Sequence, residues 1–259
     1  MLAINPYYSV AGALVGVLVG LTGVGGGSLM TPLLVLMFGF SPSTAVGTDL
    51  LFASLTKSVG SVVHGNRGTV DWAIVGRLAS GSVPAAVTTL LILHALGKPS
   101  ETTEHVIKSV LGVTLVLTSF AVLFRTQIVI YAAQNFRTRD NPHRGASTIL
   151  LGAILGVLVT ISSVGAGAIG VTALLILYPG LPVNRIVGSD IAHAVPLTLV
   201  AGLGHWFIGT VDFGLLVSLL VGSIPGIIIG SLIGSRASDR VLKPILATIL
   251  LIVGAKLLL

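Results

Sequence analysis

A glycine-rich stretch, Thr22-Gly23-Val24-Gly25-Gly26-Gly27-Ser28, interrupts a 32-residue apolar run from Tyr8 to Gly39. As one straight helix this run would reach about 48 Å at ~1.5 Å per residue. The hydrocarbon core of a bilayer is only roughly 30 Å thick. Because glycine lets the backbone leave helical geometry, we expect two half-helices, Tyr8–Thr22 and Ser28–Gly39, that meet at a glycine break.

A second break of the same kind lies within a later apolar run, at Thr160-Ile161-Ser162-Ser163-Val164-Gly165-Ala166-Gly167-Ala168. Interrupted hydrophobic segments at matching positions in two halves of a chain indicate the binding site of a transporter. The two breaks are therefore the first candidates for a functional site.

The composition indicates a polytopic membrane protein that forms a single membrane domain over residues 1–259. The chain is 54% hydrophobic and 8% charged, whereas soluble domains carry roughly 25% charged residues. The pI of about 10.1 does not indicate nucleic-acid binding, because the basic residues lie in short loops between spans. No cleavable signal peptide is expected. The chain has no cysteine, which excludes disulfides and thiolate metal sites.

The two halves of the chain repeat each other at an offset of 140 or 141 residues. The matches include glycine and polar positions that follow the same order in both halves, which chance similarity between apolar segments does not produce. The matching pairs are Gly12–Val19 with Gly152–Val159, Val46–Leu50 with Val187–Ile191, His64 with His205, Gly68–Trp72 with Gly209–Phe213, and Gly81–Pro84 with Gly222–Pro225.

We expect an all-α fold of two inverted-topology repeats, each a broken and re-entrant helix followed by three transmembrane helices. The first repeat covers residues 6–124 and the second covers residues 146–259, with a basic cytoplasmic connecting loop at 125–145. The expected spans after the breaks are 45–63, 72–94 and 106–124 in the first repeat, and 186–208, 213–234 and 241–259 in the second.

The distribution of basic residues between the two sides of the membrane predicts this orientation. If each broken element crosses the membrane, the basic residues other than Lys57 divide seven against six between its two sides. If each is a hairpin that returns to its starting side, they divide ten against three, which satisfies the positive-inside rule. Three crossings per half then invert the second half, and both termini face the outside. The ten are Arg67, Arg77, Arg125, Arg137, Arg139, Arg144, Arg185, Arg236, Arg240 and Lys243; the three are Lys98, Lys108 and Lys256.

Hairpins that enter from opposite faces would bring two helix starts together near the midplane. Free backbone N–H groups and the positive ends of helix dipoles bind anions, so we expect a small anionic substrate there. The alternative is that the glycines only permit tight helix packing. The candidate binding residues are Thr22, Gly25, Gly26, Gly27, Ser28, Ser162, Ser163, Gly165 and Gly167.

Four ionisable residues within the expected spans are candidates for coupling or gating. Asp49 and Asp190 occupy equivalent positions and could take up a coupling proton, or they could hydrogen-bond the N–H groups of the hairpins. Lys57 could attract an anion or pair with one of these carboxylates. His193 lies one helical turn from Asp190. By contrast, His64 and His205 lie at span ends and are expected to be interfacial hydrogen-bonding residues.

The first glycine-rich break, the Val46–Leu50 and Val187–Ile191 pair, and the Gly-Thr-Val-Asp-aromatic pair make the chain resemble the sulfite exporter TauE/SafE family of membrane permeases. The resemblance covers nearly the whole chain. It implies transport of sulfur-containing anions, including sulfite, sulfonates and sulfoacetate, across the bacterial inner membrane.

The sequence therefore predicts a secondary transporter of small sulfur anions in the lipid bilayer, coupled to protons or sodium. The main alternative is an anion channel without coupling. An intramembrane enzyme is disfavoured because no hydrolase, ATPase or metalloprotease motif is visible, so no catalytic residue, metal or cofactor is expected. A scaffold without transport is disfavoured by the paired acids and broken helices. Nucleic acid is not an expected partner, and a homo-oligomer is left open.

Overall fold

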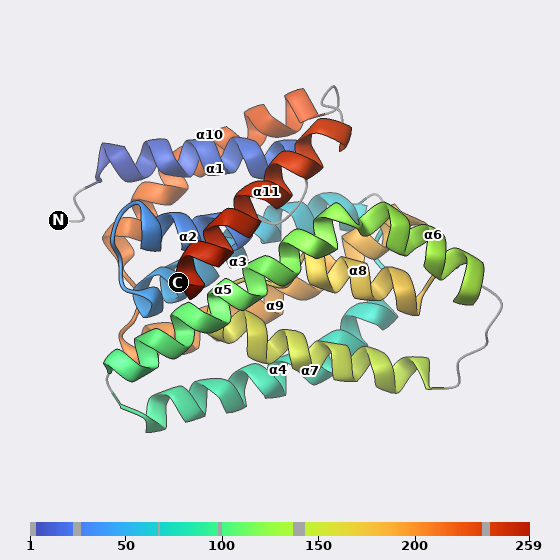
Figure 1. The fold of residues 1–259 in the computed structure, drawn as a ribbon, viewed down its shortest axis with the longest axis horizontal. Helices are drawn as coiled ribbons and strands as arrows, with labels where there is room; N and C mark the ends of the chain where they lie inside the picture. Colours follow the sequence, from blue (N-terminus) through green and yellow to red (C-terminus); the bar gives the residue numbers. More distant parts are fainter. Residues whose placement is uncertain (1–3, 23–26, 67, 98–99, 137–142, 235–238) are drawn as a thin grey trace.

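The computed structural model describes residues 4–22, 27–66, 68–97, 100–136, 143–234 and 239–259 (Figure 1). Regular structure in these residues is entirely α-helical, as the apolar composition predicts. The helices are α1 (Pro6–Thr22), α2 (Gly27–Leu36), α3 (Pro42–Asn66), α4 (Trp72–Ala95), α5 (Glu101–Leu123), α6 (Arg125–Phe136), α7 (Arg144–Ser162), α8 (Ala168–Leu177), α9 (Val183–Ile208), α10 (Phe213–Gly234) and α11 (Asp239–Leu258).

Both predicted breaks separate two helices. In the first half, α1 ends at Thr22 and α2 begins at Gly27. In the second half, α7 ends at Ser162, and Ser163 adopts a left-handed conformation with φ of 58°. Gly165 and Gly167 follow with φ of 122° and 123°, values that glycine adopts without steric cost. The second break therefore depends on glycine backbone geometry, as expected from its sequence.

Each broken element folds back on itself, so that its end lies beside its start. Near the start of α1, the Tyr8 ring packs edge-on against Phe38 and Phe40, which follow α2, at centroid distances of 5.1 and 5.6 Å. Near the start of α7, the hydroxyl of Thr148 is 2.8 Å from that of Tyr178, which follows α8. These contacts agree with the expected hairpins, and Figure 1 shows α2 returning below α1.

Helix α1 of the first half packs against α10 of the second half, and α7 of the second half packs against α4 of the first half. A Cβ atom on Gly12 or Gly16 of α1 would lie 2.3 Å from the Leu219 carbonyl oxygen or 2.5 Å from that of Ser223. Residue numbers rise together along the two helices, so α1 and α10 are parallel (Figure 1). The same relation holds between Gly152 of α7 and Leu78 of α4. Glycine permits this close backbone contact, the main packing device between apolar helices in membranes.

The equivalent helices α3 and α9 cross the centre of the bundle in opposite directions. Gly202 of α9 packs on Leu51 of α3, and Gly60 of α3 faces Ile191 of α9. The pair α5 and α11 is also antiparallel, because Gly112 contacts Leu258, whereas the Ser119 hydroxyl donates to the Ala247 carbonyl at 2.7 Å. These two pairs of equivalent helices therefore run in opposite directions, which is consistent with inverted repeats. Their orientation in a membrane stays a prediction.

Matched hydrogen bonds join the halves where α4 and α10 begin. The backbone N–H of Asp71 donates to the Ser189 hydroxyl at 2.8 Å, and that of Asp212 donates to the Thr48 hydroxyl at 3.0 Å. These residues belong to the duplicated sequence motifs, so the repetition seen in the sequence is also a repetition of contacts.

Five of the described helices are long and apolar enough to cross a membrane: α4, α5, α7, α9 and α10. The chain is accordingly a multi-pass membrane protein. Although α3 has 25 residues, it is more polar, and only its first half is buried among the other helices. The connecting segment also differs from expectation, since residues 125–136 form α6 rather than a loop. Its apolar residue Val129 packs against the cluster around Leu174 of α8, which explains the helix.

Candidate functional site

The two carboxylates predicted from the repeats lie at the hairpins, deep inside the bundle. Asp49 of α3 has no exposed surface, and its Oδ2 accepts a hydrogen bond of 2.5 Å from the Thr31 hydroxyl of α2. The hydroxyl of Ser163, in the second break, lies close to the same carboxylate. Among the described residues, neither Asp49 Oδ1 nor Ser163 Oγ has a hydrogen-bond partner. Asp49 therefore links the second half of one hairpin to the tip of the other.

Asp190 of α9 occupies the corresponding place beside α8. It is 1% exposed, and a Cβ atom on Gly170 of α8 would lie 2.3 Å from its Oδ1. The backbone N–H of Gly167, just before α8, is also close to this carboxylate. A carboxylate at a helix start is stabilised by the helix dipole and free N–H groups. Asp190 thus occupies part of the region that the sequence predicts for an anion.

The Lys57 side chain lies near enough to both acids to interact with them electrostatically. It is 8% exposed, and it interacts electrostatically with Asp190 and, more weakly, with Asp49. Within the described part of the chain, neither carboxylate comes within 4.0 Å of its amine. The direct ion pair considered from the sequence is therefore not formed, and Lys57 acts on both acids through space.

His193 joins this group from the same helix as Asp190. Its Nε2 lies 2.8 Å from the Ser82 hydroxyl of α4, and it is fully buried. Its Nδ1 has no hydrogen-bond partner among the described residues. The imidazole also experiences the positive charge of Lys57. Asp49, Lys57, Asp190 and His193 together are called the central charge cluster below.

The predicted binding residues of the second break have different environments. The Ser162 hydroxyl donates to the Leu158 carbonyl at 2.7 Å and accepts from the Val164 N–H at 3.2 Å, so its hydrogen bonds are used to hold the break. Ser163 keeps an unpartnered hydroxyl within the described residues. Gly165 and Gly167 provide the backbone turn.

The predicted residues of the first break are described only in part. Gly25 and Gly26 lie outside the described residues. Thr22 ends α1, and Gly27 and Ser28 begin α2, but only their backbone is described. Leu29, the next residue, packs against the same apolar cluster as Val164 and Ala168 at the other tip. Both hairpins therefore pack against one apolar cluster, and the convergence of their two helix starts on an anion stays a prediction.

Four buried hydroxyl side chains, two of which contact the cluster, were not singled out as site residues from the sequence. They form two pairs at an offset of 141 residues, Thr31 with Thr172 and Ser82 with Ser223. Thr31 and Ser82 bond to Asp49 and His193, whereas the hydroxyls of Thr172 and Ser223 lack partners among the described residues. A search for polar residues repeated at the same offset would have found all four.

His205, assigned from the sequence to a span end, also contacts a break. Its Nε2 lies 2.9 Å from the Thr160 carbonyl oxygen of α7, and its Nδ1 lies 2.9 Å from the Thr210 hydroxyl. His64 makes the matching 2.9 Å contact with Thr69. These histidines therefore fix the ends of α3 and α9. No metal-binding group of three His, Asp or Glu side chains occurs in the described residues.

Comparisons with known proteins agree with these features. The model of the family "Sulfite exporter TauE/SafE" matches residues 8–257. A probable membrane transporter protein of Bacillus subtilis, YjnA, is 40% identical over 95% of this chain and 97% of its own length. Another from the same organism, YdhB, is 28% identical over 80% of both chains.

A more distant relative occurs in the archaeon Methanocaldococcus jannaschii. This probable membrane transporter protein, MJ0441, is 24% identical over 78% of the chain and 72% of its own length. No solved structure gives a significant match. The family match, the end-to-end relative and the duplicated broken helices lead to one assignment: the chain belongs to the sulfite exporter TauE/SafE family.

Proposed function

We propose that this protein is a secondary transporter that moves small sulfur-containing anions, of the sulfite, sulfonate or sulfoacetate class, across the bacterial inner membrane. The observation that carries the proposal is the central charge cluster, whose two carboxylates lie beside α2 and α8, the second helices of the two hairpins. Ionisable groups within a membrane protein mark ion and substrate pathways. The family description and the names of the relatives support the same class of function.

In the proposed transport cycle, the need to balance buried charge couples movement of the anion to movement of protons. The cluster contains two carboxylates and one amine, and a bound anion adds further negative charge to a buried region. Uncompensated buried charge is costly, so each proton taken up by Asp49 or Asp190 offsets one negative charge of the cargo. Arg125 of α6, which interacts electrostatically with Asp190, favours the same balance. We therefore propose that the anion and protons move together, with sodium as the alternative coupling ion.

The cargo would bind to the groups left available at the two tips. Ser163 offers a hydroxyl without a partner among the described residues, and Gly165 and Gly167 offer close access to the backbone at the start of α8. The Lys57 amine supplies the positive charge. In this proposal the first break, around Gly26, contributes the second helix start.

Uptake into liposomes tests the proposal. Purified protein reconstituted in liposomes is supplied with sulfite, methanesulfonate or sulfoacetate, with an inward or an abolished proton gradient, and protein-free liposomes serve as the control. We expect at least one of these anions to accumulate and the inward proton gradient to raise its accumulation. Equal flux with and without proton or sodium gradients would identify a channel instead. No flux of any sulfur anion would reject the substrate class.

Single cysteines test the proposed membrane orientation. We expect His143→Cys and Val183→Cys, which flank the second hairpin, to react with an impermeant thiol reagent only in inverted vesicles. Leu96→Cys, at the far end of α4, should react only in intact cells. The native chain has no cysteine, so each label reports one site. Opposite accessibility of the first two positions would show that the second hairpin crosses the membrane.

A further inference from the structure

Two members of the central charge cluster keep polar groups without a partner in the described part of the chain. His193 is fully buried, and its Nδ1 makes no hydrogen bond to a described residue. The Lys57 amine likewise makes no hydrogen bond or close ion pair there, and its side chain is 8% exposed. Unpartnered polar groups in an apolar interior cost free energy. A ligand that supplies the missing acceptors would remove this cost.

Both groups belong to the crossing of α3 and α9. A Cβ atom on Gly60 of α3 would lie 3.5 Å from the Ile191 side chain of α9, so the two helices are in contact there. Lys57 lies one helical turn before Gly60, and His193 lies two residues after Ile191. The charge of Lys57 also acts on the His193 imidazole. The crossing therefore brings a cation and an imidazole to one place.

A count of donors and acceptors assigns the tautomer of His193. Its Nε2 lies 2.8 Å from the Ser82 hydroxyl of α4, and either atom can supply the hydrogen. If Nε2–H donated, the Ser82 hydrogen would have no acceptor among the described residues, and Nδ1 would be an unused acceptor. If Ser82 donates, only the Nδ1–H is left unused. The second arrangement leaves fewer buried groups unpaired, and it makes Nδ1 a donor.

The other repeat shows that the fold does not require these two groups. The equivalent positions, 141 residues away, are Phe52 for His193, Thr198 for Lys57 and Ser223 for Ser82. Phe52 is 1% exposed within an apolar cluster, and the Thr198 hydroxyl donates to a carbonyl of its own helix at 2.8 Å. An apolar ring and a satisfied hydroxyl thus occupy the matching places. The cation and the imidazole add a buried cost that packing does not need, which indicates a role in binding.

We propose that His193 binds the cargo, with its Nδ1–H donating to one oxygen of a sulfite or sulfonate head group while the Lys57 amine faces another. An oxyanion suits both groups, because its oxygens accept hydrogen bonds and its charge offsets that of the amine. Ser82 is a positioning residue, since its hydroxyl holds the imidazole in the tautomer that presents Nδ1–H. This inference rests on the proposed function and adds a specific contact to it.

Two amide substitutions separate the two nitrogens of the imidazole. In His193→Asn the amide N–H takes the place of Nδ1–H, whereas in His193→Gln the amide reaches toward Ser82 and the Nδ1–H is lost. Methanesulfonate affinity is measured by calorimetry on the purified full chain. We expect it to stay within about threefold of the wild type in His193→Asn and to fall at least about tenfold in His193→Gln. His193→Phe, which copies the other repeat, should lose as much as His193→Gln.

Ser82→Ala tests the positioning role. We expect a loss of affinity of about threefold or more, because the imidazole is then free to adopt either tautomer. In the His193→Asn background the same substitution should have no further effect, since Ser82 acts only through the imidazole. An equal loss in both backgrounds would show that Ser82 acts through packing and would overturn the positioning role.

Ser223→Ala is the matched control for Ser82→Ala. A Cβ atom on Gly16 would lie 2.5 Å from the Ser223 carbonyl oxygen, much as one on Gly156 would lie 2.4 Å from that of Ser82. The Ser223 hydroxyl has no partner among the described residues, so its loss should leave the affinity unchanged. In protein labelled with nitrogen-15 histidine, methanesulfonate should also shift the Nδ1 signal that is missing from His193→Asn.

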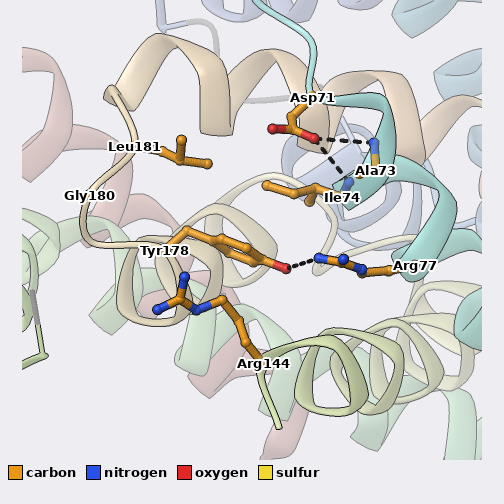
Figure 2. A pocket seen from close by; sticks show the side chains of 8 residues that line it. All are labelled: Asp71, Ala73, Ile74, Arg77, Arg144, Tyr178, Gly180 and Leu181. Carbon is orange, nitrogen blue, oxygen red and sulfur yellow. Dashed lines mark hydrogen bonds between the residues drawn. The ribbon is translucent and has the colours of Figure 1, made fainter. Parts of the chain in front are cut away.

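A cavity of about 390 Å³ is the alternative location for an anion. It lies between the start of α4, the start of α7 and the loop after α8, and Figure 2 shows Arg77 and Arg144 among its lining residues. Arg77→Ser tests this location, because Ser218 occupies the equivalent position in the other repeat. Loss of affinity in Arg77→Ser, with wild-type affinity in His193→Gln, would place the anion in this cavity and overturn the inference.

Uptake into liposomes separates failure of this inference from failure of the proposed function. If the wild type and His193→Gln take up and bind methanesulfonate equally, the inference is wrong and the proposed function stands. If the wild type neither binds nor takes up any sulfur anion, both are rejected. Loss of binding in His193→Gln and His193→Phe, with binding retained in His193→Asn, would support the contact with Nδ1–H.

Discussion

Lys57→Met is expected to destabilise the protein at pH 8.5, by less than the roughly 3–5 kcal/mol that breaking a direct buried ion pair costs. The reason is that Asp49 and Asp190 then remain buried without their nearby cation. At pH 5.5 the loss should be smaller, because a protonated carboxyl group needs no compensating charge. Thermal unfolding in detergent at the two pH values measures both effects.

Two further variants show whether the loss arises from charge. Lys57→Met combined with Asp190→Asn should recover stability at pH 8.5, since one positive and one negative charge have then been removed. Lys108→Met, a charge loss on the partly exposed side of α5, should change stability little. Binding of the transported anion should weaken at least about tenfold in Lys57→Met, which corresponds to 1.4 kcal/mol. Wild-type stability and affinity in this variant would rule out the charge-balance explanation.

Asp49→Asn and Asp190→Asn are expected to remove the response of anion uptake to an imposed proton gradient. A coupled transporter can accumulate its cargo up to about tenfold per proton for each pH unit of gradient, whereas a variant without the titrating group should lose that proton's contribution. Asparagine resembles a neutral carboxyl group, and its carbonyl can still accept the Thr31 hydrogen bond made by Asp49. Anion binding at pH 5.5 should therefore stay within about threefold of the wild type.

Uptake into liposomes across gradients of one pH unit measures this response. Glu101→Gln is the control, because Glu101 is an exposed residue in the first turn of α5. If both asparagine variants keep the wild-type pH profile, the two carboxylates only hold the hairpins in place. If one variant loses the response and the other keeps it, only one of the two duplicated carboxylates binds the coupling proton.

The sequence was informative where single residues impose backbone geometry or burial cost. The glycines at 165 and 167 predicted a break in the helix. The structure shows why glycine is needed there, because their φ values near 120° exclude most other residues. Asp49 and Asp190 were identifiable because a carboxylate in an apolar span is costly. The pattern of basic loops also favoured hairpins, in agreement with the contact of Tyr8 with Phe38.

The sequence did not predict in the same way which helices pack against each other. The pairing of α1 with α10 depends on whether the surface around Gly12 fits the backbone at Leu219, and hydropathy carries no information about such a fit. The environment of Lys57 was also undetermined, since its spacing from Asp49 along one helix does not give the position of Asp190 on another. The cavity beside Arg77 combines residues from α4, α7 and the loop after α8, so no local pattern could reveal it.

The pairing of α1 with α10 also has a consequence for how the protein is made. Backbone and side-chain contacts between the two helices join residues about 210 positions apart, such as Asn5 with Ser218. Synthesis proceeds from the N-terminus, so α1 and its hairpin leave the ribosome long before the surface that will cover Gly12 and Gly16 exists. The first hairpin must therefore wait in the insertion machinery or in lipid without its native neighbour. Assembly of the N-terminal half can be completed only when nearly the entire chain has been translated.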